Sequence, residues 1–464
     1  MKAYRGYLVH ISGAPLLSEA ATHLVGEPDG ALLVDDTGRI VFSGEYRSMP
    51  SGGVEDVEVV DCRPGFLVPG FIDTHIHFPQ TYCVDSYGGG QLLDWLERCI
   101  FPAESAFVDP EYARVAAQEF CARRVAVGTT TALVFGSAFP QAQDALFTES
   151  IATGLRTISG RGIQTVGPES AALLLTAETT AIELTEAEIS RWHAADTGDH
   201  RTATIHVAVV PRFALSVTAE TLTALGDVYD TVRDTGVYFH SHLSENLVEN
   251  AAVRSAYDVD CYLDTYDGKF GRGSAQSGKS LLGRRSVLAH AVHCRDDELA
   301  RMAETQTSIA HCPTSQLFLG SGTMPWARTT ASGVNVALGT DVSAGDEWLL
   351  SRVANDCFKV HMSEPVDAAV SLTAADVLFT ATLAGARALD LEERIGNLDV
   401  GKEADFVVID PQRQRLLPEM LARIDADDTD RVVFTLLMAM REEAITEVYV
   451  RGRRVDGPQP SQPC

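Results

Sequence analysis

The fold is decided by one stretch, Phe66-Leu67-Val68-Pro69-Gly70-Phe71-Ile72-Asp73-Thr74-His75-Ile76-His77. Its apolar run predicts a buried strand, and this strand ends in two histidines that are two residues apart. Because alternate side chains of a strand point to the same face, His75 and His77 lie side by side. Neutral imidazole is a common ligand of zinc and related metals, so this strand end is a candidate metal site. Paired histidines also occur on protein surfaces, but the buried strand ahead of this pair favours the metal site.

Short apolar runs alternate with helical patterns downstream of this strand. The runs are residues 131–135, 204–210, 237–240, 286–289, 308–310 and 334–338, and helical patterns include 110–127, 219–233 and 297–304. Strands that alternate with helices indicate parallel β/α units. We therefore predict a (β/α)₈ TIM-like barrel over residues 67–389.

Both ends of the chain have strand character. Residues 31–34 and 39–42 flank the turn at 35–38, which predicts a hairpin, and residues 7–11, 405–410 and 447–455 also resemble strands. We predict a small β-sandwich domain built from both termini, residues 1–66 together with 390–456. The proline-rich end, residues 457–464, is predicted to be a disordered tail.

Composition excludes several classes of protein. The chain has 464 residues, with 45% hydrophobic and 22% charged residues, which is typical of a globular protein. The formal net charge of −27 disfavours nucleic acid and anionic membranes as partners. Nine scattered cysteines without a C-x-x-C motif argue against a disulfide framework. No signal peptide is evident and no apolar run reaches the ~18 residues of a membrane helix, so we expect a cytoplasmic protein.

Further metal-ligand residues follow later predicted strands. His242, His290 and Asp341 each stand at or just after the end of an apolar run. The carboxyl ends of parallel strands meet on one face of a barrel, which predicts a single-metal centre with one position open for water. Either histidine taken alone is better explained as an ordinary buried residue, but the whole set favours a site. The neighbouring histidines, for which we expect structural or supporting roles, are His240, His293 and His311.

Many of these motifs occur together in one known family. The matching stretches are residues 69–80, 92–96, 101–104, 128–132, 211–213, 241–246, 289–290, 311–315, 339–341 and 395–405. With them, the chain resembles the amidohydrolase superfamily and, within it, the guanine deaminases. The resemblance covers nearly the whole chain. The metal motifs are shared across the superfamily, whereas Gln80, Trp95 and Arg212-Phe213 together resemble guanine-deaminase sites.

The resemblance implies a role for each matched position. One metal ion per chain, usually zinc but with iron possible, would be held by His75, His77, His242 and Asp341. His290 would be a further ligand or a partner of the metal's water. The base pocket would be lined by Gln80, Trp95, Leu96, Arg212, Phe213 and Glu245. The resemblance also implies a homodimer.

The chemistry of the residues agrees with these roles. A bound metal lowers the pKa of its water from ~16 to about 7, so hydroxide is available at neutral pH. Asp341 is placed to take the water proton, and Glu245 to give a proton to a ring nitrogen before ammonia leaves. With His290, these are the candidate catalytic residues. The alternative for Glu245 is a structural carboxylate at a helix N-terminus near Ser244.

The pocket residues suit a flat, amide-like ring. Arg212 offers forked donors to a ring carbonyl, and Gln80 has both a donor and an acceptor. Phe213 and Trp95 can pack against the ring. The simpler alternatives are that Trp95 belongs to the core and that Arg212 pairs with a carboxylate. Two stretches depart from the family pattern, Gly160 to Pro168, which we expect to touch the substrate, and Gln316, where the family has asparagine.

We therefore predict zinc-dependent deamination of guanine to xanthine and ammonia. One alternative is a related enzyme that acts on 8-oxoguanine, a pterin or a triazine, and another is a non-catalytic metal-binding scaffold. A scaffold has no need for a proton shuttle at Glu245. A two-metal amidase would need a carbamylated lysine, but no lysine lies between Lys2 and Lys269. A nucleic-acid deaminase would carry H-x-E and P-C-x-x-C motifs, which the sequence lacks.

Overall fold

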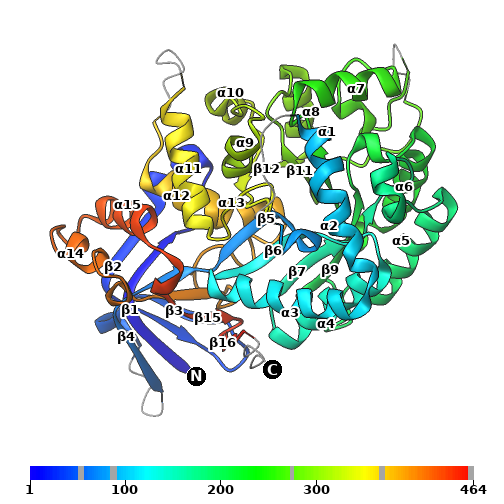
Figure 1. The fold of residues 1–464 in the computed structure, drawn as a ribbon. Helices are drawn as coiled ribbons and strands as arrows, with labels where there is room; N and C mark the ends of the chain where they lie inside the picture. The colour runs from blue at the N-terminus through cyan, green and yellow to red at the C-terminus, as the bar shows by residue number, and fades with distance from the viewer. Residues whose placement is uncertain (51–56, 84–90, 272–275, 365–370, 458–464) are drawn as a thin grey trace.

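The computed structural model describes residues 1–50, 57–83, 91–271, 276–364 and 371–457. Two sheets organise these residues (Figure 1). One is a parallel barrel surrounded by helices, and the other gathers the blue amino-terminal and red carboxy-terminal strands at one side of it. Among the described residues, no helix is long and apolar enough to cross a membrane. Beyond Gly457, the predicted disordered tail lies outside the described residues.

The barrel confirms the predicted (β/α)₈ fold. Its strands, in hydrogen-bonded order, are β5 (Phe71–His77), β6 (Thr129–Phe135), β7 (Arg156–Gly160), β9 (Ile205–Pro211), β10 (Tyr238–Leu243), β11 (Ser286–His290), β12 (Ser308–His311) and β13 (Val336–Leu338). All neighbouring pairs along this path are parallel. The short strand β8 (Gly162–Ile163) adds to β9 beside them. Strand β7 was not among the predicted runs, because its alternating polar residues break the apolar pattern.

Helices follow the strands on the outside of the barrel (Figure 1). They include α3 (Pro110–Ala126), α4 (Pro140–Thr153), α5 (Glu178–Trp192), α6 (Ala219–Val232), α7 (Leu247–Tyr257), α8 (Asp296–Thr305), α9 (Pro313–Leu319), α10 (Trp326–Ala331), α11 (Leu350–Met362), α12 (Ala374–Ala381) and α13 (Leu383–Ala388). The side chain of Asp109 accepts the N–H of Glu111 and caps α3, as the predicted helix requires. The short helices α1 (Leu92–Trp95) and α2 (Phe101–Ser105) lie between β5 and α3 in the chain.

The first and last strands of the barrel meet at a closing seam. The N–H of Asp341 donates to the carbonyl of His75 at 2.8 Å, and the N–H of His77 donates to the carbonyl of Val342 at 3.2 Å. Buried Asp73 reinforces the seam, because its carboxylate accepts the N–H and the hydroxyl of Thr340 at 3.1 and 2.6 Å. The seam therefore fixes the position of the last strand relative to the two histidines of the first.

The second sheet confirms the predicted β-unit from both termini. Its strands, in order, are β16 (Arg453–Arg454), β15 (Ile445–Val450), β14 (Phe406–Ile409), β4 (Glu58–Pro69), β1 (Lys2–Ile11), β2 (Leu24–Val34) and β3 (Ile40–Glu45). They form one continuous hydrogen-bonded path. The rings of Tyr4, Phe406 and Tyr449 pack together with centroids 4.4 to 5.0 Å apart. The carboxy-terminal segment also contains two helices that were not predicted, α14 (Leu417–Leu421) and α15 (Thr429–Ala439).

Gly70 separates two strands within residues 66–77. Strand β4 ends at Pro69 in the terminal sheet and β5 begins at Phe71 in the barrel, so the predicted single strand is two strands. Strand β4 runs three residues past the predicted boundary at residue 66. A Cβ atom at position 70 would lie 2.2 Å from the Thr130 hydroxyl oxygen, which only glycine avoids.

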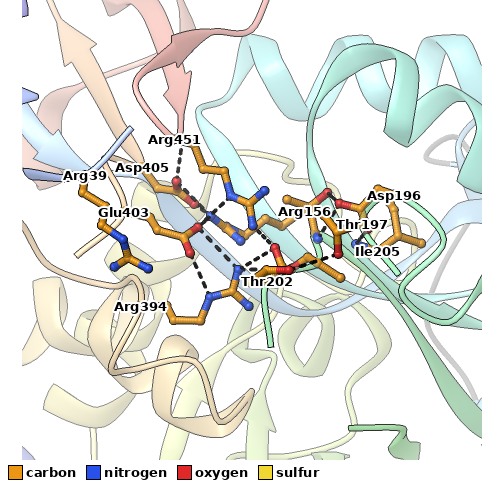
Figure 2. A network of polar contacts seen from close by, with 12 residues as sticks. Arg39, Arg156, Asp196, Thr197, Thr202, Ile205, Arg394, Glu403, Asp405 and Arg451 are labelled. Carbon is orange, nitrogen blue, oxygen red and sulfur yellow. Dashed lines mark hydrogen bonds and ion pairs between the residues drawn. The ribbon is translucent and has the colours of Figure 1, made fainter. Parts of the chain in front are cut away.

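A buried polar network ties the two sheets together (Figure 2). Arg156, on β7, donates from Nε to Asp405 at 2.5 Å and from Nη2 to Glu403. Arg394 and Arg451 reach the same Glu403 carboxylate at 3.0 and 2.8 Å. Although burial favours the neutral acid, Arg156 and Arg394 hold the pKa of Glu403 below its ordinary value. The terminal sheet is therefore joined to the barrel by charges that water does not screen.

Replacing Arg156 should destabilise the whole chain. In Arg156→Ala, two buried carboxylates lose their main partner, which should lower the free energy of unfolding by about 3–5 kcal/mol at neutral pH. Since the pKa of Glu403 is lowered by folding, this contribution is present above its unfolded pKa of about 4.3 and is lost as the pH falls further. Urea unfolding at pH 7 and at about pH 3 measures both effects. The exposed pair of Arg201 with Asp199 supplies the control, because Arg201→Ala should change stability by less than about 1 kcal/mol.

Candidate active site

Four side chains meet where the first, fifth and last barrel strands end. The Nε2 atom of His77 lies 3.2 Å from Nε2 of both His75 and His242. The Oδ1 atom of Asp341 lies 3.1 and 3.2 Å from Nε2 of His75 and His77. Ligands that share a tetrahedral metal at bonds of about 2.0–2.1 Å lie roughly 3.3 Å apart. The group therefore has the spacing of a metal centre, and all four atoms face one point.

Hydrogen bonds on the far sides of the rings leave lone pairs facing this point. His240 Nδ1 lies 2.7 Å from the Val287 carbonyl, which can only accept, so Nε2 of His240 is an acceptor. His75 must then donate from Nδ1 at 2.8 Å, which leaves its Nε2 unprotonated. His242 likewise donates from Nδ1 to the Arg212 carbonyl at 2.5 Å. Lone pairs held this close repel each other unless a cation lies between them, so the residues fit a bound metal.

Asp341 contributes a carboxylate with one oxygen free. Its Oδ2 atom accepts the hydroxyl of Ser315 at 2.6 Å, while Oδ1 has no hydrogen-bond partner among the described residues. Burial favours the neutral acid, but the imidazoles of His75 and His77, 3.1 and 3.2 Å from Oδ1, hold the pKa of Asp341 well below its ordinary value. An ionised oxygen therefore faces the same point as the imidazole lone pairs.

His290 and Glu245 stand beside this group. The His290 ring lies nearly parallel to that of His242, and its Nε2 is 3.4 Å from Glu245 and 3.7 Å from Asp341. Burial lowers the pKa of His290 to about 3. Burial, together with the nearby Asp341 charge, raises the pKa of Glu245 well above its ordinary value. The structure thus places the His290 imidazole, and a carboxyl group whose environment favours its neutral form, next to the candidate metal ligands.

Glu245 does not cap the neighbouring helix, because other residues accept the hydrogen bonds at its N-terminus. Helix α7 is capped by Asn246, and Glu249 accepts the N–H groups of Glu245 and Asn246 at 3.1 and 3.2 Å. The Glu245 side chain instead accepts the hydroxyl of Ser321 at 3.1 Å and faces His290. Glu249 therefore carries out the local structural function and leaves Glu245 directed into the site.

The predicted base-pocket residues line one common cavity. Its walls are His77, Gln80, Leu92, Trp95, Leu96, Arg212, Phe213, His242, Glu245, Glu249, His290, Leu319, Asp341 and Ala344. All predicted site residues except His75 are among them, and Nε2 of His75 lies 3.2 Å from Nε2 of His77. Trp95 and Phe213 also belong to one apolar cluster. The buried indole N–H of Trp95 has no hydrogen-bond partner among the described residues, so it remains available to a ligand.

Arg212 lines the cavity and also forms an ion pair with a buried carboxylate, so the two interpretations of this residue do not exclude each other. That carboxylate is Glu104 on α2, which also accepts Nε2 of Gln80 at 2.8 Å. Glu104 was inside a recognised stretch but was not predicted as a site residue. The sequence feature that could have indicated Glu104 is its place directly after the apolar run at residues 100–103. A carboxylate that is buried with such a run needs a polar partner.

The two departures from the family pattern lie away from the metal ligands. No residue of the 160–168 segment lines the site cavity, which differs from the expected contact with substrate. Gln164 and Val166 to Pro168 instead line a neighbouring cavity that shares Leu96 and Phe213 with the site. Gln316 places its Nε2 3.5 Å from Nδ1 of His311. The segment can therefore act on the pocket only through shared wall residues.

A second group with metal-ligand chemistry is His311, Cys357 and His361. Here the two Nε2 atoms are 2.9 Å apart, and Nδ1 of His361 lies 2.6 Å from Glu364. One proton between the rings and one to Glu364 complete a hydrogen-bonded chain. His311 therefore has a hydrogen-bond partner within this group, and the ring of His293 contacts the Ser321 carbonyl at 2.9 Å.

Fold and site together define a class, the metal-dependent hydrolases built on a (β/α)₈ barrel. The model of the amidohydrolase family matches residues 66–455, and the chain belongs to this family. It is similar to a probable guanine deaminase of Deinococcus radiodurans, with 37% identity over 97% of this chain and 98% of that protein. The guanine deaminase of Escherichia coli is 36% identical over 98% of both chains. The structure of the E. coli enzyme superimposes with a TM-score of 0.85 and covers 99% of each chain.

Metal content tests the ligand group directly. We expect the purified protein to retain about one equivalent of divalent metal after dialysis. His242→Ala should lose most of this metal, because one of the three converging imidazoles is removed. Elemental analysis by mass spectrometry measures both. His200→Ala, a histidine outside the site, is the matched control; equal metal in wild type and His242→Ala would exclude this group as the centre.

Proposed function

We propose that the protein hydrolyses guanine to xanthine and ammonia at this site. The observation that carries the proposal is that a metal-ligand group and the buried carboxyl of Glu245 line the same cavity as Arg212 and Gln80. Full-length similarity to guanine deaminases supports the same substrate. The proposal extends to zinc as the resident metal, to a homodimer and to a cytoplasmic location, as the family resemblance suggests.

His75, His77, His242 and Asp341 would hold the metal. When bound, it supplies Lewis-acid chemistry that makes a water molecule acidic enough to act as a nucleophile near neutral pH. The hydrogen bonds that His75 donates to His240 and that His242 donates to the Arg212 carbonyl keep the ligand rings oriented for this purpose. Iron is the alternative metal that the same ligands accept.

The acid–base steps belong to the residues of this chain. Asp341 accepts the proton of the attacking water, and Glu245 donates its proton to a nitrogen of the ring as the oxygen adds to the carbon that bears the amino group. Transfer of the water-derived proton from Asp341 to the amino nitrogen makes ammonia the leaving group, and the remaining hydroxyl proton returns to Glu245 as the new carbonyl forms. His290 lies within 3.7 Å of both carboxylates and, being neutral, holds the water between them.

Flat side chains and directed polar groups orient the ring. Phe213 and Trp95 supply apolar walls, and the unpaired indole N–H of Trp95 can donate to a ring nitrogen. Arg212 supplies donors for a ring carbonyl. Leu96 and Phe213 are shared with the neighbouring cavity, so the positions of these two side chains would decide whether a wider ring such as a pterin fits. Similar rings, such as 8-oxoguanine or a triazine, remain the competing substrates.

Substrate assays test the proposed reaction. With zinc loaded, ammonia release from guanine should be at least about tenfold more efficient in kcat/KM than from 8-oxoguanine, isoxanthopterin or a triazine. Preference for another ring would keep the hydrolase and reject guanine as its substrate. Absence of turnover on every ring, with metal bound, would favour the non-catalytic scaffold.

Replacing Glu245 separates catalysis from metal binding. Glu245→Gln keeps the size of the side chain but removes the transferable proton, so kcat should fall by about 100-fold or more while the metal content stays the same. Parallel assays of ammonia release and metal content measure the two effects. Glu220→Gln, on the exposed surface of α6, should match wild type. Wild-type turnover in Glu245→Gln would remove the proposed role.

A further inference from the structure

Glu104 is a buried carboxylate that stands behind the base pocket. It is 3% exposed, and each of its oxygens has one partner. Oε2 forms a close ion pair with Nη1 of Arg212, and Oε1 accepts Nε2 of Gln80 at 2.8 Å. Both partners line the site cavity, whereas Glu104 does not. One carboxylate therefore contacts the two polar residues that are placed to read the ring.

The contact with Glu104 fixes which atom Gln80 presents. Its amide nitrogen must face the carboxylate, because the reverse orientation would bring two acceptor oxygens together. The Oε1 atom then points the other way, where the N–H of Ser343 lies 3.4 Å from it. Gln80 thus offers the substrate an acceptor, although its amide alone could offer either a donor or an acceptor.

The same carboxylate holds Arg212. The ion pair engages Nη1, and the guanidinium carbon lies 5.4 Å from the centre of the Phe101 ring. Among the described residues, no other acceptor hydrogen-bonds to this guanidinium, so its remaining N–H groups are free to donate into the cavity. Pairing with Glu104 also balances a charge that would otherwise be buried next to a neutral ring.

We propose that Glu104 is a positioning residue that makes the pocket selective for a lactam edge, a ring carbonyl next to a ring N–H. This inference rests on the proposed function and identifies the part of the substrate that the pocket recognises. Arg212 donates to the carbonyl, and Oε1 of Gln80 accepts the adjacent N–H. An amidine edge presents an amine and a bare nitrogen instead, which places donor against donor and acceptor against acceptor.

Two rings with the same 2-amino group test this selectivity. Guanine has a lactam edge, whereas 2,6-diaminopurine has an amidine edge at the same place. In Glu104→Gln, one amide cannot accept from both partners, so Gln80 is free to turn. We expect kcat/KM for guanine to fall by about 10- to 100-fold and that for 2,6-diaminopurine to change by less than about 3-fold. Equal losses for both rings would overturn the inference, because they indicate a purely structural role.

Two further variants distinguish a loss of selectivity from a loss of folded protein. Glu104→Asp keeps the charge but is too short to contact both partners, so it should fold and lose part of the selectivity. Glu111→Gln makes the same change as Glu104→Gln in an exposed ion pair and should leave the ratio of the two kcat/KM values unchanged. Thermal melting of all variants shows which of them are folded at the assay temperature.

Binding without turnover separates this inference from the proposed reaction. Hypoxanthine has the lactam edge and purine lacks it, and neither carries an amino group to remove. Calorimetry with the metal-loaded protein should show tighter binding of hypoxanthine in wild type and loss of that preference in Glu104→Gln. If this holds while guanine is not deaminated, the proposed reaction fails and the inference stands. Equal binding of both rings to wild type overturns the inference whether or not guanine is deaminated.

Discussion

The active site depends on the closing seam of the barrel. His75 and His77 are on the first strand and Asp341 follows the last, so they meet only because β5 and β13 are joined. Asp73 strengthens the join by accepting two hydrogen bonds from Thr340, next to Asp341. Gly339 permits the approach, since a Cβ there would lie 2.8 Å from the His75 Cβ. The seam that completes the fold therefore also completes the proposed metal centre.

In the proposed site, metal binding and ring recognition would be physically coupled. The carbonyl of Arg212 orients the ligand His242, while the guanidinium of the same residue faces the base pocket. Glu104 then connects this guanidinium to Gln80. A shift of the strand end at residue 212 would move a metal ligand and a substrate contact together, which keeps the reacting carbon in register with the nucleophile.

The sequence predicts the barrel and the terminal β-unit, and it selects four candidate ligands that the structure brings together, because these depend on local patterns. His75, His242 and Asp341 each stand at or just after the end of an apolar strand run. The sequence alone therefore predicts that the three side chains lie on one face of a parallel barrel. Strand β7 is harder to recognise, since Arg156, Thr157 and Ser159 are polar yet buried by partners far along the chain. Glu104 illustrates the same limit: its partners are 24 and 108 residues away, and no local pattern indicates them.

An anomalous difference map, recorded at the absorption edge of the bound metal, tests the central claim most directly. We expect one strong peak per chain, about 2.0–2.2 Å from Nε2 of His75, His77 and His242 and from Oδ1 of Asp341. A peak between His311, Cys357 and His361 instead, or no peak in crystals of active protein, would contradict it, because the closing seam would then have no part in the chemistry.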